Sequence, residues 1–405
     1  MATSSESHIS LTELHIDPYA PAEMAGRAQA VGIAKAMDAL FRWMYRLPLK
    51  STALFVWLLV ACGTGGPGAA APGPPPAARE AAAPSTPAAP PPPVTVRVGI
   101  LNSIGDAPFS IGIEKGFYAE QGLIIETVPF DSAARMIAPL STGQLEVGQG
   151  VISAGALNAV ARGVDIKGIA GASASPPGHG NTAYVLRRDL VEQIRSPADL
   201  RGRKLGLAAR GTGIEIELAE LLRRGGLTLD EVELVQLNFS EQVTALANQA
   251  LDLAAIPEPA ATLAVDRGVG HIWLRADELI PNHLTSFIWA GPHFVAQPDV
   301  ARRFLVAALK AVRLYNDAFF KHDPQVREEL IQIFIKHTPV KDRGLYDRMV
   351  FQGFDPDGRI NRESVERDMQ YYLATGQLQA PVDLDRLIDL RFADYAVAVL
   401  GPYPR

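Results

Sequence analysis

The chain has 405 residues, enough for two or three compact domains and far more than one small core requires. Hydrophobic residues make up 48% and charged residues 20%, a balance typical of a packed globular protein rather than a disordered one. The net charge of −6 falls on residues 94–405, because acids and bases balance before them, and a weakly acidic body argues against nucleic acid as a partner.

The first part of the chain carries an export pattern. Basic residues precede an uncharged apolar stretch at 51–61, which is too short to span a membrane comfortably and has the length of a signal-peptide apolar region. The stretch ends at Cys62, and Leu59-Val60-Ala61-Cys62 resembles the bacterial lipobox, whose cysteine is acylated. We predict a lipoprotein signal peptide at 44–62 with lipidation at Cys62. The alternative is a hydrophobic helix with a buried cysteine.

Two further segments flank this signal. We interpret residues 1–43 as an upstream extension, either an unusual leader or sequence ahead of the true start codon. Residues 63–93 consist almost entirely of Pro, Ala and Gly, which cannot bury a core and form an extended tether. Cys62 is the only cysteine, so neither a disulfide nor a thiolate metal cage can form within one chain. The order of segments predicts a domain held outside the cell at a membrane surface.

Residues 94–405 alternate short apolar runs with helical patterns, as βα units on a mostly parallel sheet do. We expect strands at 96–101, 124–130, 145–148, 166–170 and 205–208, and a helix that begins at Pro108 and ends near Gly122. Another helix follows Gly213 and is capped by Gly225.

The body contains two similar series of elements. Phe130-Asp131-Ser132, Leu145-Glu146-Val147 and Arg162-Gly163-Val164 recur in the same order as Asn238-Phe239-Ser240, Leu251-Asp252-Leu253 and Arg267-Gly268-Val269. All βαβ units look somewhat alike, so chance is the alternative. The pattern favours two similar lobes with a cleft between them.

Several segments resemble the type II extracytoplasmic solute-binding proteins of ABC importers, in the group that handles nitrate, sulfonates, taurine and thiamine-precursor pyrimidines. The resemblance is carried by segments 114–123, 140–148, 196–206, 256–259 and, most loosely, 382–389. It implies the type II periplasmic-binding-protein fold, with two α/β lobes joined by two hinge crossovers. Lobe I would comprise 94–183 and 284–405, and lobe II 184–283, with hinge strands at 182–186 and 285–289.

The resemblance further implies a monomer that delivers a solute to an ABC permease and its ATPase. In such a fold the carboxyl ends of the strands and the following helix N-termini face the binding crevice and favour polar or anionic groups. The ligand-binding candidates are Asn102, Ser103, Asp131, Ser132, Gln149, Gly150, Ser153, Ser173, Arg210, Gly211, Thr212, Gly213, Asn238 and Glu258. The serines could instead cap helices, the glycine loop could be a tight turn, and Glu258 could buttress a helix start.

The sequence contains no zinc-hydrolase H-E-x-x-H pattern, no G-x-S-x-G elbow and no phosphate-binding P-loop. We therefore expect binding without chemistry, with no cofactor and no metal. The alternatives are an enzyme on the same scaffold, of the menaquinone-pathway lyase type, and a solute-sensing module. The sequence does not identify the solute.

Overall fold

The computed structural model describes residues 93–404. The predicted upstream extension, signal peptide, acylated Cys62 and all but the last residue of the tether lie outside the described residues.

The first sheet has five strands, of which four are parallel. In spatial order they are β2 (Leu123–Pro129), β1 (Val94–Ile100), β3 (Val147–Val151), β12 (Ser286–Ala290) and β4 (Lys167–Gly171). Only β12 is antiparallel to its neighbours, and it pairs with both β3 and β4. Strand β12 is buried along its whole length, as a central strand covered on both faces must be.

The second sheet repeats this order. Its strands are β8 (Glu233–Gln236), β7 (Lys204–Leu207), β9 (Leu253–Pro257), β6 (Thr182–Arg187) and β10 (Gly270–Arg275). Here β6 is the antiparallel strand, between β9 and β10. Strands β1 to β4 therefore correspond to β7 to β10, and the prediction of two similar series is confirmed. We call the first sheet with its helices the first lobe, and the second sheet with its helices the second lobe.

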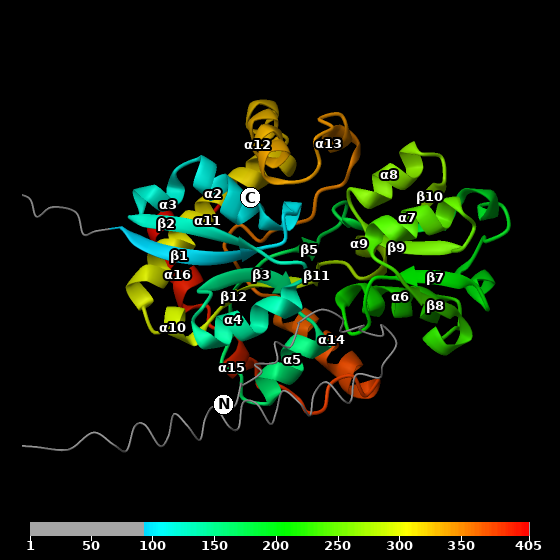
Figure 1. Cartoon of the computed structure of the whole chain (residues 1–405), viewed down its shortest axis with the longest axis horizontal. Helices are drawn as coiled ribbons and strands as arrows, with labels where there is room; N and C mark the ends of the chain where they lie inside the picture. The colour runs from blue at the N-terminus through cyan, green and yellow to red at the C-terminus, as the bar shows by residue number, and fades with distance from the viewer. Residues whose placement is uncertain (1–92, 405) are drawn as a thin grey trace, which may run out of the picture. The chain divides into compact units, whose positions relative to one another are not determined.

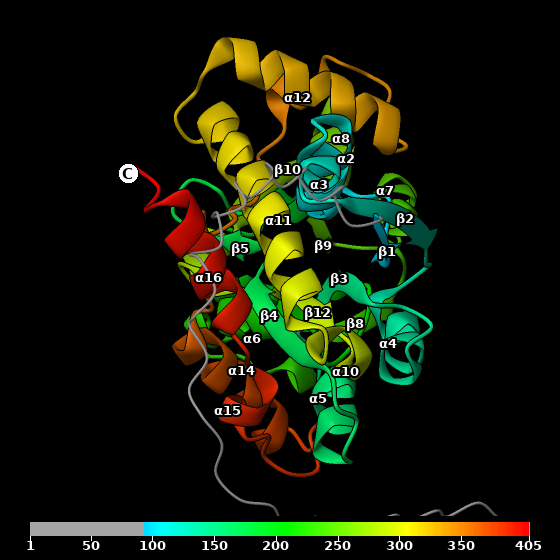
Figure 2. The ribbon, with the colours of Figure 1, turned by 90° about the vertical axis from the view of Figure 1, so that its left-hand side faces the viewer.

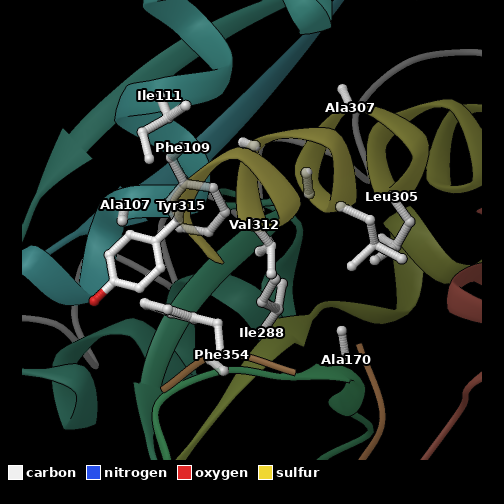
Figure 3. Packing of buried hydrophobic residues seen from close by; sticks show 14 of the residues in the cluster. Ala107, Phe109, Ile111, Ala170, Ile288, Leu305, Ala307, Val312, Tyr315 and Phe354 are labelled. Atoms are coloured by element: carbon white, nitrogen blue, oxygen red, sulfur yellow. The ribbon is translucent and has the colours of Figure 1, made fainter. Parts of the chain in front are cut away.

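Helices cover both faces of the first sheet. One face packs against α2 (Ala107–Glu114), α11 (Pro298–Phe319) and α16 (Arg391–Leu400), and α11 runs across it beside α16 (Figure 2). Phe109, Ile288 and Tyr315 meet in this core (Figure 3). The other helices of the lobe are α3 (Phe117–Glu120), α4 (Ile137–Thr142), α5 (Ala154–Ala161), α10 (Pro292–Val295), α12 (Pro324–His337), α13 (Leu345–Arg348) and α15 (Leu384–Leu387).

The second lobe has a smaller set of helices. They are α6 (Gly213–Arg224), α7 (Phe239–Ala247), α8 (Ala260–Asp266) and α9 (Ala276–Leu279). Helix α6 buries Ile216, Leu218, Leu221 and Leu222, and it ends at Gly225 as the sequence predicts. Short 3-10 turns stand at Ile104–Asp106, Ala133–Met136, Arg188–Leu190, Pro197–Leu200 and Leu229–Glu231 in the two lobes.

Two short strands lie between the sheets (Figure 1). Strands β5 (Ala174–Ser175) and β11 (His283–Leu284) pair in antiparallel fashion, and we call them the hinge pair. Helix α14 (Arg362–Ala374) packs against β11, α5 and α6. The segments expected as hinge strands form β6 and β12, one in each large sheet. The exact lobe limits, 94–183 with 284–405 and 184–283, stay a prediction.

Two sequence predictions need correction. The single helix expected from Pro108 to Gly122 is two helices, α2 and α3, because Gly116 adopts φ +72° between them. The third strand was expected to end at Gly148, but it continues to Val151 because β12 pairs with it as far as that residue. Gln149 and Gly150 therefore lie inside β3 rather than after it.

Candidate functional site

The loops that follow β3 and β7 meet at the boundary of the two lobes. The Ala154 amide, at the start of α5, donates a hydrogen bond of 2.9 Å to the carbonyl of Gly211, just ahead of α6. Ser153 caps α5 by accepting from the Ala156 amide at 3.2 Å. We call residues 152–154 and 208–213 the interlobe junction. The N-termini of α5 and α6 both lie at this junction, where helix dipoles favour negative or polar groups.

The glycine loop of the junction is built around a buried carboxylate. Glu215 in the first turn of α6 accepts from the Gly211 amide and from Arg210 Nε, the latter at 2.7 Å. It also accepts from Gln377 Nε2 at 2.8 Å. Gly211 has φ +70°, and a Cβ there would lie 3.1 Å from the Cβ of Ala154. Gly211 therefore suits both the turn and the close contact between lobes.

The other three predicted residues of this loop also have structural roles. The Arg210 guanidinium, about half exposed, is already paired with a carboxylate, which reduces the positive charge it offers an anion. Thr212 is the N-cap of α6, and its hydroxyl donates to the Ala209 carbonyl at 3.1 Å. A Cβ on Gly213 would lie 3.1 Å from the ring of His283. The loop is thus both a tight turn and part of the junction.

Gln149 forms a buried polar cluster with two serines at the end of the first sheet. Its Nε2 is 3.1 Å from Ser173 Oγ and 3.4 Å from Ser286 Oγ, and the Ser173 amide donates to Ser286 Oγ at 2.8 Å. Gln149 Oε1 has no hydrogen-bond partner among the described residues, although the residue is only 6% exposed. A buried acceptor without a partner is available to a bound molecule. The sequence did not single out Ser286.

The turn after β1 holds a second buried carboxylate. Asp106 Oδ2 accepts from the amides of Leu101 and Ser103 at 3.1 and 2.8 Å. Burial raises the pKa of Asp106 to about 6. Asn102 adopts φ +52°, and with Ser103 it lines a cavity of about 20 Å³, enough for one water molecule. This turn places both predicted residues at the carboxyl end of β1.

Other predicted residues do not take part in these clusters. Asp131 and Ser132 are exposed, and Asp131 pairs with Arg135 at 3.0 Å on the surface. Gly150 lies inside β3 and packs against Ala133 and Trp289. Asn238 caps α7 by accepting from the Glu241 amide at 2.9 Å, and the Glu241 carboxylate accepts from the Asn238 amide in return. This reciprocal capping gives Asn238 a structural role at the start of α7.

Glu258 also has partners within the protein. Its carboxylate pairs with Arg275 at 2.9 Å and accepts from the amide of Thr262, in the first turn of α8, at 2.9 Å. The side chain of Glu258 is fully buried. These contacts favour the interpretation of Glu258 as a buttress of its helix start over that of a solute contact.

The sequence analysis missed a buried histidine cluster, which consists of Glu217, His283 and Asp368. The three side chains have no exposed surface. Their partners are separated by 66 and 85 residues along the chain, so no local motif reveals them.

A larger cavity, of about 740 Å³, lies beside the hinge pair. Its apolar wall includes Phe320 and Phe354, and its charged residues are Lys321, Asp355 and Arg359. No sequence signal marked it, because its walls come from segments far apart in the chain. Residues 93–404 contain no group of acidic, histidine or cysteine side chains arranged to hold a metal ion. Within the same range, no helix is long and apolar enough to cross a membrane.

The family model described as NMT1/THI5 like matches residues 105–317, more than half of the chain. The chain belongs to the NMT1/THI5-like family. Among curated relatives, a putative binding protein of Brucella abortus is 25% identical over 316 residues, which cover 75% of this chain and 92% of the relative. The predicted family resemblance is confirmed.

Solved structures share the fold of this NMT1/THI5-like chain. The alkanesulfonate-binding protein SsuA of Xanthomonas axonopodis pv. citri, bound to MOPS, has a TM-score of 0.59 at 14% identity, covering 74% of this chain and 99% of SsuA. The nitrate-binding protein NrtA of Synechocystis PCC 6803 has a TM-score of 0.61 at 16% identity, with coverages of 77% and 91%. The predicted two-lobed α/β fold is therefore confirmed.

The same fold also occurs in an enzyme. The desulfurization enzyme DszB has a TM-score of 0.56 at 17% identity and covers 76% of this chain and 99% of its own. Membership of this fold alone therefore does not decide between a binding protein and an enzyme.

Proposed function

We propose that the chain is the solute-binding component of an ABC importer and holds a small polar or anionic solute at the interlobe junction. The observation that carries this proposal is the meeting of two strand ends, that of β3 from the first lobe and that of β7 from the second, at the Ala154–Gly211 hydrogen bond. Two lobes of the same strand order, joined by a short hinge pair, form a device that can close on a ligand. The similarity to SsuA and NrtA supports the same assignment.

The polar groups at the strand ends indicate the solute class. The N-termini of α5 and α6 offer partial positive charge, and Gln149 Oε1 offers an unpartnered acceptor. Arg210 adds a cation that is shared with Glu215. A compact anion such as a sulfonate or nitrate fits the helix N-termini and Arg210. Gln149 Oε1 can only accept a hydrogen bond, so it suits the ammonium group of taurine or a ring N–H of a pyrimidine-like compound.

The proposal extends to location and partners. Acylation of Cys62 would anchor the protein outside the cell, the tether at 63–93 would separate the anchor from the lobes, and a monomer would dock on a permease with its ATPase. Membrane fractionation tests the anchor: the Cys62→Ser variant should lose the acyl group by mass spectrometry and move from the membrane to the soluble fraction. Unchanged fractionation would contradict lipid anchoring.

A thermal-shift screen of the full chain tests solute binding. Nitrate, alkanesulfonates, taurine, aromatic acids and pyrimidines are added in excess, and a ligand that binds only the folded state raises the melting temperature by mass action. The ligand is then recovered and analysed by mass spectrometry. Recovery of an unchanged compound supports a binding protein, whereas a converted compound would support the enzyme alternative.

Single-residue variants locate the binding site of any solute that raises the melting temperature. Thr212→Trp should abolish the shift because it fills the junction, while the unliganded melt changes little. Thr244→Trp is the matched control, since Thr244 is an exposed residue of α7 whose hydroxyl also makes one backbone hydrogen bond. Arg359→Ala removes a charged residue from the cavity beside the hinge pair and tests whether the solute binds there. A shift lost only in Arg359→Ala would move the solute site from the junction to that cavity.

A further inference from the structure

The histidine cluster joins three elements of the fold. His283 lies on β11 of the hinge pair, Glu217 on α6 of the second lobe and Asp368 on α14. His283 Nδ1 is 2.7 Å from Glu217 Oε1, and Nε2 is 3.0 Å from Asp368 Oδ2. Both ring nitrogens therefore face carboxylates in a site that water does not reach.

When both carboxylates are ionised, this geometry requires a proton on each ring nitrogen. A neutral imidazole has one N–H and one bare lone pair, so one of the two carboxylates would face a lone pair without a donor. An imidazolium donates to both. Burial by itself lowers the pKa of His283, but the hydrogen bonds and charges of Asp368 and Glu217 outweigh it and raise the pKa to about 9.

Helix α14 and the chain after it also bind the first lobe. Tyr372 donates to the carbonyl of Ile152 at 3.3 Å. Asn158 on α5 donates to the Gln377 carbonyl at 2.7 Å and accepts from the Gln379 amide at 3.1 Å. The cluster thus ties a helix that is fastened to the first lobe to a helix of the second lobe.

Other ionisable groups surround the cluster, and they decide which of the two contacts of His283, that with Glu217 or that with Asp368, is the weaker. Around Glu217 and Asp368 lie Tyr184 on β6, Arg367 and Tyr372 on α14, and Glu215 with its partner Arg210. Arg367 Nη2 is 3.5 Å from Asp368 Oδ1 and offers that carboxylate another cation. Glu217 has only the 3.2 Å bond from the Tyr184 hydroxyl besides His283. When His283 loses one proton, the N–H that remains stays with Glu217 and the contact with Asp368 is lost. Helix α14 is then joined to α6 through Glu215, which accepts from Gln377 at 2.8 Å and from the Tyr371 hydroxyl at 3.4 Å.

We propose that Glu217, His283 and Asp368 form a proton-dependent latch between the lobes, which holds them together while His283 is charged and loosens α14 from the second lobe when it is neutral. The latch acts on the hinge and needs no solute. Its test is therefore independent of the solute-binding proposal.

The distance between the lobes tests the latch. In the full chain with Cys62→Ser, spin labels are attached at Ala134→Cys in the first lobe and Ala247→Cys in the second, both exposed positions. Pulsed electron paramagnetic resonance then gives the distribution of distances between the two labels at pH values from 6 to 9.5. We expect one narrow peak at neutral pH that is lost with a midpoint near pH 9. A peak that stays narrow up to pH 9.5 would overturn the latch.

Variants assign the transition to the cluster. His283→Gln should lack the narrow peak already at pH 7, while His271→Gln, a partly buried histidine of β10 in the second lobe, should behave as the unsubstituted chain. Asp368→Asn keeps the shape of the side chain but removes one carboxylate that stabilises the charged ring, so the midpoint of the pH transition should move to lower pH. An unchanged midpoint in Asp368→Asn rejects the assignment. The pH series on the intact cluster remains decisive even where His283→Gln does not fold.

Discussion

The histidine cluster makes a quantitative prediction for stability. The pKa of His283 is about 9 in the folded chain and 6.5 for an ordinary histidine, so folding favours the protonated ring. A raised folded pKa contributes stability that is fully present below pH 6.5 and is lost as the pH rises through about 9. With about 1.4 kcal/mol for each pKa unit, the loss across this window is on the order of 3 kcal/mol.

Urea unfolding of the full chain at several pH values between 6 and 9.5 measures this loss. The reference is the triple variant Glu217→Gln/His283→Gln/Asp368→Asn, which keeps the approximate shape and removes every titrating group of the cluster. The unsubstituted chain should lose about 3 kcal/mol relative to this variant as the pH rises from 6.5 to 9. A difference between the two proteins that stays constant across the window would refute a charged His283.

Three further predictions concern the other buried groups. Gly211→Ala forces a side chain into left-handed backbone, so the free energy of unfolding should fall by about 1 to 2 kcal/mol in a urea titration. Arg275→Met leaves the Glu258 carboxylate buried without its cation and should cost about 3 kcal/mol by the same assay, whereas Arg135→Met on the surface should leave the melting temperature unchanged. Burial raises the folded pKa of Asp106 to about 6, so the protonated carboxyl group stabilises the fold below pH 3.8, and this contribution is lost as the pH rises through 6. The free energy of unfolding of the unsubstituted chain should therefore fall by about 3 kcal/mol relative to that of Asp106→Asn between pH 3.8 and 6. Parallel curves of unfolding free energy against pH would contradict this prediction.

Local patterns predicted the strands and the recurrence of elements well. The β1 and β2 runs are apolar and end in polar loops, so their bounds differ from the prediction by no more than two residues. The helix break at Gly116 was missed because apolar residues continue on both sides of it. Strand β3 was predicted too short because its last three residues, Gln149 to Val151, are strand only through their pairing with β12, which comes more than a hundred residues later.

The candidate site was predictable only in part for the same reason. Strand-end loops can be identified from sequence, and Ser153, Gly211 and Thr212 do lie where the lobes meet. The carboxylate that organises this junction, Glu215, was not among the predicted residues. Its donors Arg210 and Gly211 are close in sequence, but its third donor, Gln377, is 162 residues away and could not be predicted. The cap role of Asn238 was predictable in principle, since Glu241 follows at the capping-box spacing.

The topology also limits where the lobes can move. Strands β6 and β12 are each hydrogen-bonded on both sides within their sheets, so a rotation of one sheet against the other has to be absorbed in the segments that cross between them. Those segments touch each other: Asp277 Oδ2 accepts from the Gly178 amide at 2.7 Å, and a Cβ on Gly180 would lie 2.0 Å from Asp277 Oδ1. The two crossovers therefore act as one hinge. His283 lies in one of these two crossovers. A change in its protonation can therefore affect the movement of both crossovers.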